Sequence, residues 1–418
     1  MKNLLILFLS FYSILVPAQQ SFVDKYNLPV YDCGQANYNK FWKSDVIVVI
    51  PDNVDGIYKD AENIVKSNKE KNVNITIKKE SQLERGDLNS NLFILGTIYT
   101  YKKWNELGIP VSKLKQGFKI DNRVFYDPLH GFTYVSDSIT VPMRVAYIGN
   151  NMESYKQLSN MPALGFTFVV KNNTVPVAIA RDKNLFDLSA LRKTHYKEKE
   201  SKYYTFMLSD NLSKEQIETC NERLERYDKH VEAFTEKLKL NMPTRKIKTY
   251  IHADQQEIKY MSATYSDLCY NGTMYGYALN DEIHASGFSD NAIQHEAGHW
   301  LINNQINKTT ANFISEGIQM WYMLSTNDEF KQQGLLMARQ FSTEDLTDVI
   351  TGKENFFQGD KYYLISGIFV SYLIEKYGVE KFKELYSFNH DEMLIGFEKT
   401  YSTSLPAIVQ DYNKWVVE

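Results

Sequence analysis

The feature that most restricts this chain is the segment 290–300, in which two histidines stand four positions apart and a glutamate directly follows the first. Residues four apart on a helix point the same way, so His295 and His299 can reach one metal ion if the segment is helical. Imidazole nitrogen binds zinc at about 2.0–2.1 Å. The segment therefore predicts a helix that carries two metal ligands.

Other residues of this segment fit the same interpretation. Glu296 lies one position round from His295 and misses the metal, but it can hydrogen-bond a water there, where a general base is needed. We expect Asp290 to cap the helix and Gly298 to allow close packing beneath the metal. The buried side of the helix is predicted to carry Ile293, Ala297 and Leu301.

A catalytic zinc site needs a third protein ligand and an open position. Glu316, seventeen residues after His299, can supply that ligand if the polar segment 303–310 turns the chain back into a second, antiparallel helix. Thr309 or Thr310 is the expected cap of that helix. A glutamate is seldom buried without a cation, and this one lies among the apolar residues Phe313, Ile314 and Ile318.

The run His295-Glu296-Ala297-Gly298-His299, followed by Ser315-Glu316-Gly317, resembles the gluzincin metallopeptidases, in particular the peptidase-MA-like group. The similarity covers roughly residues 205–418 and is looser at 362–378 and 397–415. It implies a zinc-dependent hydrolase of peptide bonds. In such an enzyme one catalytic zinc is held by His295, His299 and Glu316, and Glu296 is the general base.

The resemblance also implies a substrate cleft. Gluzincins place a sheet edge beside the zinc helix, and residues 274–285 are the candidate for that edge. A Tyr or His commonly stabilises the oxyanion, which makes Tyr362 and Tyr363 the candidates, with His284 as a further possibility. The G-x-M-E-N motif of aminopeptidase gluzincins is absent from the sequence, which favours an endopeptidase.

Two alternatives belong to other classes. The first is a catalytically silent surface protein on a peptidase fold that binds peptides or glycans; the intact Glu296 argues against it, because a binding module has no use for a base beside the metal. The second is a structural zinc, which fits poorly because three protein ligands leave one position open.

Hydrophobic patterns predict the rest of the fold. A capping box at Ser213 and Gln216 begins a long amphipathic helix whose apolar positions recur every three or four residues: Ile217, Cys220, Leu224, Tyr227, Val231, Phe234 and Leu238. Residues 247–251 and 275–284 are expected strands, the second broken at residues 280–281. From Asp290 to the C-terminus the pattern is almost wholly helical.

The first half alternates between strand and helix patterns, which predicts a small α/β domain with a partly parallel sheet. The expected strands are residues 46–50, 73–77, 92–95 and 145–148, and the expected helix is 54–65. The fold class is thus α+β. A signal peptide (1–18) precedes an N-terminal α/β domain (19–204) and a zincin-like domain (205–418), in which a sheet with an edge strand leads into a mostly helical part.

The first eighteen residues have the features of a secretory signal peptide. Lys2 precedes an apolar run from Leu4 to Val16 that is too short to span a bilayer, and Val16-Pro17-Ala18 fits a cleavage site. The expectation is a secreted, periplasmic or cell-surface protein with no membrane span. Its three cysteines, Cys33, Cys220 and Cys269, are expected to be mostly buried and unpaired, although a disulfide between Cys220 and Cys269 stays open.

The net charge of −4, with acidic and basic residues mixed along the chain, gives no sign of a nucleic-acid binder. The expected partner is a peptide or protein substrate, and the sequence leaves the oligomeric state open.

Overall fold

The computed structural model is a mixed α/β structure with several sheets and a helical C-terminal part. The signal-peptide segment 1–18, Cys33 and Cys269 lie outside the residues that it describes. The described residues are 21–28, 41–68, 73–136, 142–159, 168–171, 174–179, 185–262, 274–279, 281–287, 289–306, 310–353, 356 and 361–417.

The chain forms two compact units. The first holds the described residues up to Tyr196 together with two later segments, Ser209–Ser213 and His252–Met274. The second holds Lys197–Leu208, Lys214–Ile251 and the chain from Tyr275 onward. The backbone therefore passes from one unit to the other several times, beginning shortly before the expected boundary at residue 204.

The first unit is built on a sheet whose strand order is β11-β10-β9-β7-β8-β3-β1-β2. Four neighbouring strands are parallel, and each matches an expected strand: β2 (Ile75–Lys79), β1 (Val46–Ile50), β3 (Asn91–Thr97) and β8 (Arg144–Gly149). The sheet continues with antiparallel pairings through strands that sequence patterns missed: β7 (His130–Val135), β9 (Phe168–Lys171), β10 (Thr174–Ile179) and β11 (Leu185–Asp187).

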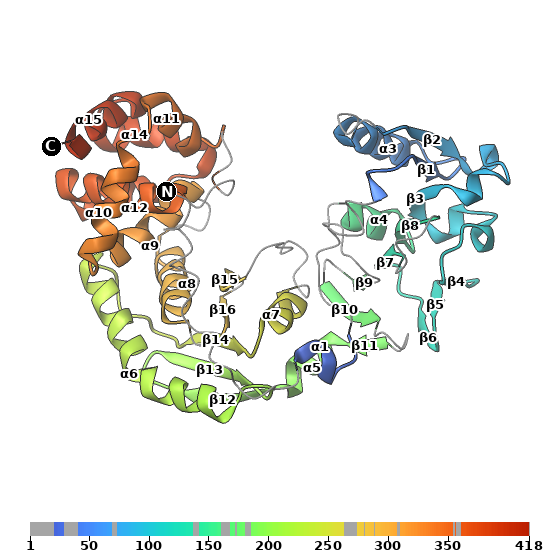
Figure 1. Cartoon of the computed structure of the whole chain (residues 1–418), viewed down its shortest axis with the longest axis horizontal. Coiled ribbons are helices and arrows are strands. Elements are labelled where there is room, and N and C mark those ends of the chain that lie inside the picture. Colours follow the sequence, from blue (N-terminus) through green and yellow to red (C-terminus); the bar gives the residue numbers. More distant parts are fainter. Residues whose placement is uncertain are drawn as a thin grey trace. The chain divides into compact units, whose positions relative to one another are not determined.

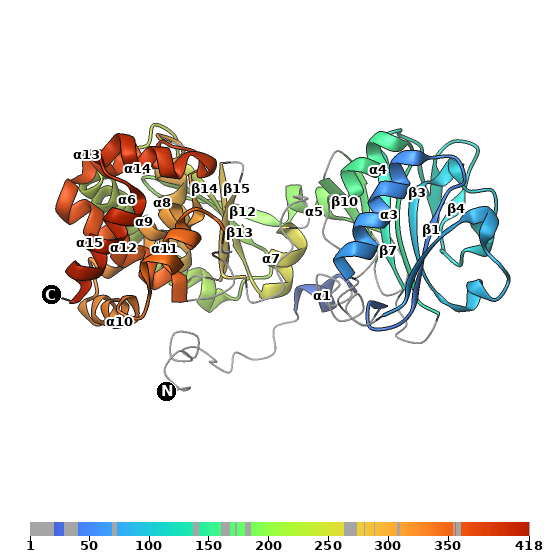
Figure 2. The same cartoon turned by 90° about the horizontal axis from the view of Figure 1, so that it is seen from above.

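Both faces of this sheet are covered, which explains why its parallel strands are continuously apolar. On one face Ile57 and Ala61 of α3 (Asp55–Asn68) and Tyr155 of α4 (Met152–Ser159) pack against alternate residues of the parallel strands. Figure 2 shows these two helices lying side by side along the sheet. The other face packs against 3-10 turns and a small sheet formed by β4 (Ser112–Lys113), β5 (Phe118–Ile120) and β6 (Arg123–Phe125).

The second unit contains a sheet with the strand order β12-β13-β14-β16-β15 (Figure 1). The segment 275–284, which we expected to be one strand broken at residues 280–281, forms a hairpin of two strands. Only its first strand, β15, is the last strand of the sheet; β16 lies inside the sheet, so the expected edge at 274–285 is correct for its first half alone. The hairpin turns at Asp281, whose φ of 68° is left-handed. The strands are β12 (Tyr196–Glu200), β13 (Tyr204–Ser209), β14 (Ile247–His252), β15 (Gly276–Leu279) and β16 (Glu282–Ser286).

The long amphipathic helix is α6 (Lys214–Lys237). Its buried face meets the sheet where the ring of Tyr227 contacts Phe206 and Tyr204. The predicted apolar stripe is confirmed over most of its length, but Ile217 in the first turn is exposed. Cys220 is a buried free thiol, and burial raises its pKa to about 11.

The remainder of the second unit is helical, as the sequence predicts. No helix among the described residues is long and apolar enough to cross a membrane. The helices are α8 (Asp290–Asn303), α9 (Asn312–Leu324), α10 (Asp328–Ala338), α11 (Thr343–Ile350), α12 (Lys361–Tyr377), α13 (Val379–Tyr386), α14 (Met393–Tyr401) and α15 (Leu405–Val417).

Candidate metal site

The helix that carries both candidate histidines, α8, begins one residue earlier than expected. Its N-cap is Ser289, whose hydroxyl accepts a hydrogen bond from the backbone N–H of Ala292. The expectation that Asp290 caps the helix is therefore wrong. Asp290 is instead the first helical residue, and its carboxylate pairs with Arg223 and Arg226 of α6. An acidic side chain in the first turn also suits the helix dipole, so this ion pair fixes the start of α8 against α6.

The second helix, α9, begins after Ala311, which has extended backbone and makes no side-chain capping bond. The expected cap at Thr310 is therefore wrong, and Thr309 lies outside the described residues. Thr310 is buried instead of capping the helix. Phe313, Ile314 and Ile318 are buried as predicted, and they fix the face of α9 that is turned away from solvent.

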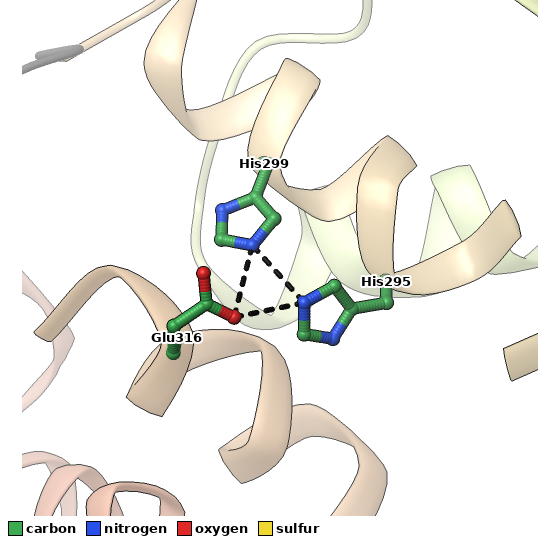
Figure 3. A group of neighbouring side chains, drawn as sticks. All are labelled: His295, His299 and Glu316. Carbon is green, nitrogen blue, oxygen red and sulfur yellow. Dashed lines mark hydrogen bonds and ion pairs between the residues drawn. The ribbon is translucent and has the colours of Figure 1, made fainter. Parts of the chain in front are cut away.

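His295, His299 and Glu316 converge from the two helices (Figure 3). The Nε2 atoms of the two histidines lie 3.1 Å apart, and Glu316 Oε2 lies 3.0 Å from His295 Nε2 and 3.4 Å from His299 Nε2. Metal–ligand bonds of about 2.0–2.1 Å at tetrahedral angles place ligand atoms about 3.3 Å apart. The three atoms therefore have the spacing that a single ion of zinc size requires.

Glu316 is kept in its charged form by the two histidines that it faces. Burial by itself would raise the pKa of Glu316, but the imidazoles of His299 and His295 outweigh burial and hold the pKa well below its ordinary value. Glu316 is thus an anion that faces two ring nitrogens. Among the residues that the structure describes, His295, His299 and Glu316 form the group whose ligand atoms lie close enough together to hold a metal ion.

Gly298 allows the two helices to approach each other, as the sequence suggests. A Cβ atom at this position would lie 1.7 Å from Oε1 of Gln319, a residue of α9 that is almost fully buried. Since His299 directly follows Gly298, and Glu316 lies one turn before Gln319, this contact sets the separation of the two helices close to the ligands.

Glu296 lies against the last strand of the sheet. A Cβ atom on Gly276 of β15 would lie 3.1 Å from Glu296 Cγ, and the backbone of Ala278 on the same strand lies near the carboxylate. Burial raises the pKa of Glu296 to about 7; His295 opposes this increase and the negative charge of Glu316 adds to it. Glu296 is therefore poised to take or release a proton near neutral pH.

Sequence reasoning missed the side chains behind His299. Ser315 Oγ lies 3.3 Å from His299 Nδ1 and also 3.3 Å from the hydroxyl of Tyr386 in α13. The position of Ser315 directly before Glu316 is a local signal that could have suggested such a role. Tyr386 follows Glu316 by seventy residues, with no spacing in the sequence that relates the two.

The candidates for oxyanion stabilisation have other described contacts. Tyr362 is buried, and its ring packs on Phe341 and Phe356; Tyr363 is half-buried, and its ring also packs on Phe356. These ring contacts do not assign a catalytic hydroxyl, so that role stays a prediction for both tyrosines. His284 is stacked between Tyr250 and Tyr277 at ring separations of 4.7 and 4.4 Å.

A second group of histidines lies in the first unit. His195 Nε2 is 3.1 Å and His252 Nδ1 is 3.4 Å from Glu257 Oε1, and all three side chains are buried. Burial would raise the pKa of Glu257, but hydrogen bonds from His195 and His252 lower it to about 2. Ser209 adds a hydrogen bond to the other carboxylate oxygen. This buried hydrogen-bonded cluster ties α7 (Gln255–Ser262) to His195 and Ser209 within the first unit.

The fold and the site together define a mixed α/β protein with a His–His–Glu group that could hold one metal ion. No protein-family model matches the chain, and no curated protein matches it significantly.

Proposed function

We propose that the chain is a zinc-dependent metallopeptidase of the gluzincin type, built on a zincin-like second unit. The observation that carries the proposal is the convergence of His295, His299 and Glu316 within 3.0–3.4 Å of one another, with Glu296 next to His295 on the same helix. Two neutral imidazoles and one carboxylate form a donor set typical of catalytic zinc, and three protein ligands leave a position open.

Zinc, when bound, supplies a Lewis acid that polarises a carbonyl and lowers the pKa of water. The protein's own groups then determine how the proton moves. Glu296 is partly buried, lies near the backbone of Ala278, and has a pKa of about 7 in the metal-free protein. In the proposed reaction its carboxylate takes the proton of the attacking water and passes it to the leaving amine.

Strand β15 provides a place for an extended peptide. Ser286 donates its N–H to the carbonyl of Tyr275, so the antiparallel pairing directs the backbone groups of Gly276 and Ala278 away from β16. Glu296 meets the strand at these same two residues. In the proposed complex a peptide adds to this edge as a further strand, which brings its backbone beside the general base.

The catalytically silent alternative differs in one respect. A peptide- or glycan-binding protein on this fold needs no proton acceptor, whereas Glu296 has a raised pKa and lies next to the group that could hold metal. We therefore favour the enzyme, and an endopeptidase in particular. We also propose that residues 1–18 direct export to the cell surface, the periplasm or the medium; a mature N-terminus at Gln19 would support this.

The test compares purified wild type with Glu296→Gln, which keeps the shape of the side chain and removes its basicity. Each protein is analysed for zinc and incubated with a mixed peptide library. The proposal expects about one zinc per chain in both and cleavage by the wild type alone. Zinc without cleavage by the wild type would favour the silent alternative, and wild type without zinc would refute the proposal.

A further inference from the structure

Behind the candidate metal site, a chain of side chains runs inward from His299 through three helices. Ser315 Oγ lies 3.3 Å from His299 Nδ1, the Tyr386 hydroxyl lies 3.3 Å from Ser315 Oγ, and Tyr386 donates to Asn303 Oδ1 at 2.9 Å. Asn303 is the last residue of α8, Ser315 belongs to α9 and Tyr386 ends α13. The chain thus connects the metal-facing imidazole to a helix far along the sequence.

The hydrogen bonds in this chain have one consistent direction. An amide oxygen only accepts, so the proton of Tyr386 points to Asn303 and the phenol oxygen is left to accept from Ser315. Ser315 then has its lone pairs free to accept a proton from His299 Nδ1. A proton on Nδ1 leaves Nε2 with its lone pair, and Nε2 is the atom that faces His295 and Glu316.

Burial keeps the chain intact. Tyr386 is fully buried, which raises the pKa of its hydroxyl and keeps the proton that the hydrogen bond to Asn303 requires. A phenol buried at this position is also shielded from water that would compete for Ser315. The aromatic ring packs separately on Phe382, so the hydroxyl can be removed while the ring contact is retained.

We propose that Tyr386 is a positioning residue for the metal site: acting through Ser315, it holds His299 in the tautomer and orientation that present Nε2 to the metal. This inference rests on the metal site of the proposed function. Groups that orient a metal-bound histidine in this manner typically change metal affinity by 10–100-fold when they are removed.

The experiment measures the zinc dissociation constant by competition with a chromophoric chelator, together with the thermal unfolding of each metal-free protein. Ser315→Ala is expected to weaken zinc binding by about 10–100-fold, and Tyr386→Phe by about tenfold. The double variant is expected to match Ser315→Ala, because Tyr386 acts only through that serine. The matched control is Tyr412→Phe, a fully buried tyrosine of α15, which should bind zinc like the wild type.

The outcomes separate this inference from the function it rests on. If the wild type binds zinc and Tyr386→Phe binds it equally well, the positioning role is refuted while the metal site stands. A loss of affinity that is equal in Tyr386→Phe and Tyr412→Phe would also refute it, since such a loss reports general loosening of the helical part. If the wild type binds no zinc, the metal site fails together with the inference.

Discussion

Replacing Gly298 with alanine tests how the two ligand-bearing helices are held together. The added Cβ would lie 1.7 Å from Gln319 Oε1 and 2.7 Å from its Cδ, where ordinary contact begins at 3.4 Å. The distance between the added Cβ and Gln319 Oε1 must therefore increase by about 1.7 Å (3.4 − 1.7). Gln319 is only 2% exposed, so its amide must either turn aside within the closely packed core or push the two helices apart.

Two effects on stability oppose each other. Overpacking costs about 1–3 kcal/mol, whereas alanine is favoured over glycine in a helix by about 1 kcal/mol. The net expectation is a loss of about 0–2 kcal/mol. Zinc affinity should respond more strongly, because site geometry has to be kept within about 0.5 Å and the displacement falls between His299 and Glu316. We expect zinc binding to weaken by at least about tenfold.

The assay is chelator competition for zinc, with denaturant unfolding of the metal-free protein. Gly56→Ala in α3 is the matched control, since a Cβ there has nothing within 4 Å. This control variant should bind zinc like the wild type and be at least as stable. Adding Gln319→Ala to Gly298→Ala should restore part of the affinity. A Gly298→Ala protein that is as stable as the wild type and binds zinc equally well would refute the reasoning.

Three further substitutions have definite expected outcomes. Glu316→Gln removes the carboxylate of the metal group and should weaken zinc binding by more than about 100-fold, measured by the same competition; unchanged affinity would rule it out as a ligand. Glu257→Ala leaves two buried imidazoles without their anion and should lower the free energy of unfolding by about 3–5 kcal/mol in denaturant titrations, while a change below about 1 kcal/mol would contradict that role. His230, which burial holds at a pKa of about 3, binds its proton only on unfolding when the pH lies between about 3 and 6.5. The free energy of unfolding of the metal-free protein should therefore fall by about 1.4 kcal/mol for each pH unit of acidification in that window, and His230→Phe should remove this contribution. An equal pH dependence of the free energy of unfolding in the two proteins would contradict the assignment.

The parts of the fold that follow from short-range patterns could be predicted from the sequence. The parallel strands are buried on both faces, so each one is a continuous apolar run such as residues 46–50. The long helix α6 has a three- and four-residue repeat. The antiparallel half of the first sheet lacks such a pattern, because β7 mixes polar with apolar residues and β10 contains Pro176, a residue that is unfavourable inside a strand.

The candidate site shows the same division. His295 and His299 are fixed by local helix geometry, and their spacing was enough to place them together. The N-cap of their helix was mispredicted because Ser289 and Asp290 are both residue types that cap helices. Asp290 instead pairs with arginines of α6, a tertiary contact that the local sequence does not show. The contribution of Tyr386 depends on tertiary packing of α13, which no local spacing in the sequence encodes.

The most direct test of the central claim is X-ray diffraction from crystals of the zinc-loaded protein, recorded on both sides of the zinc absorption edge. The account predicts one anomalous peak per chain, about 2.0–2.2 Å from Nε2 of His295, Nε2 of His299 and an oxygen of Glu316. A peak bound by other residues, or no peak in crystals grown with zinc, would contradict it.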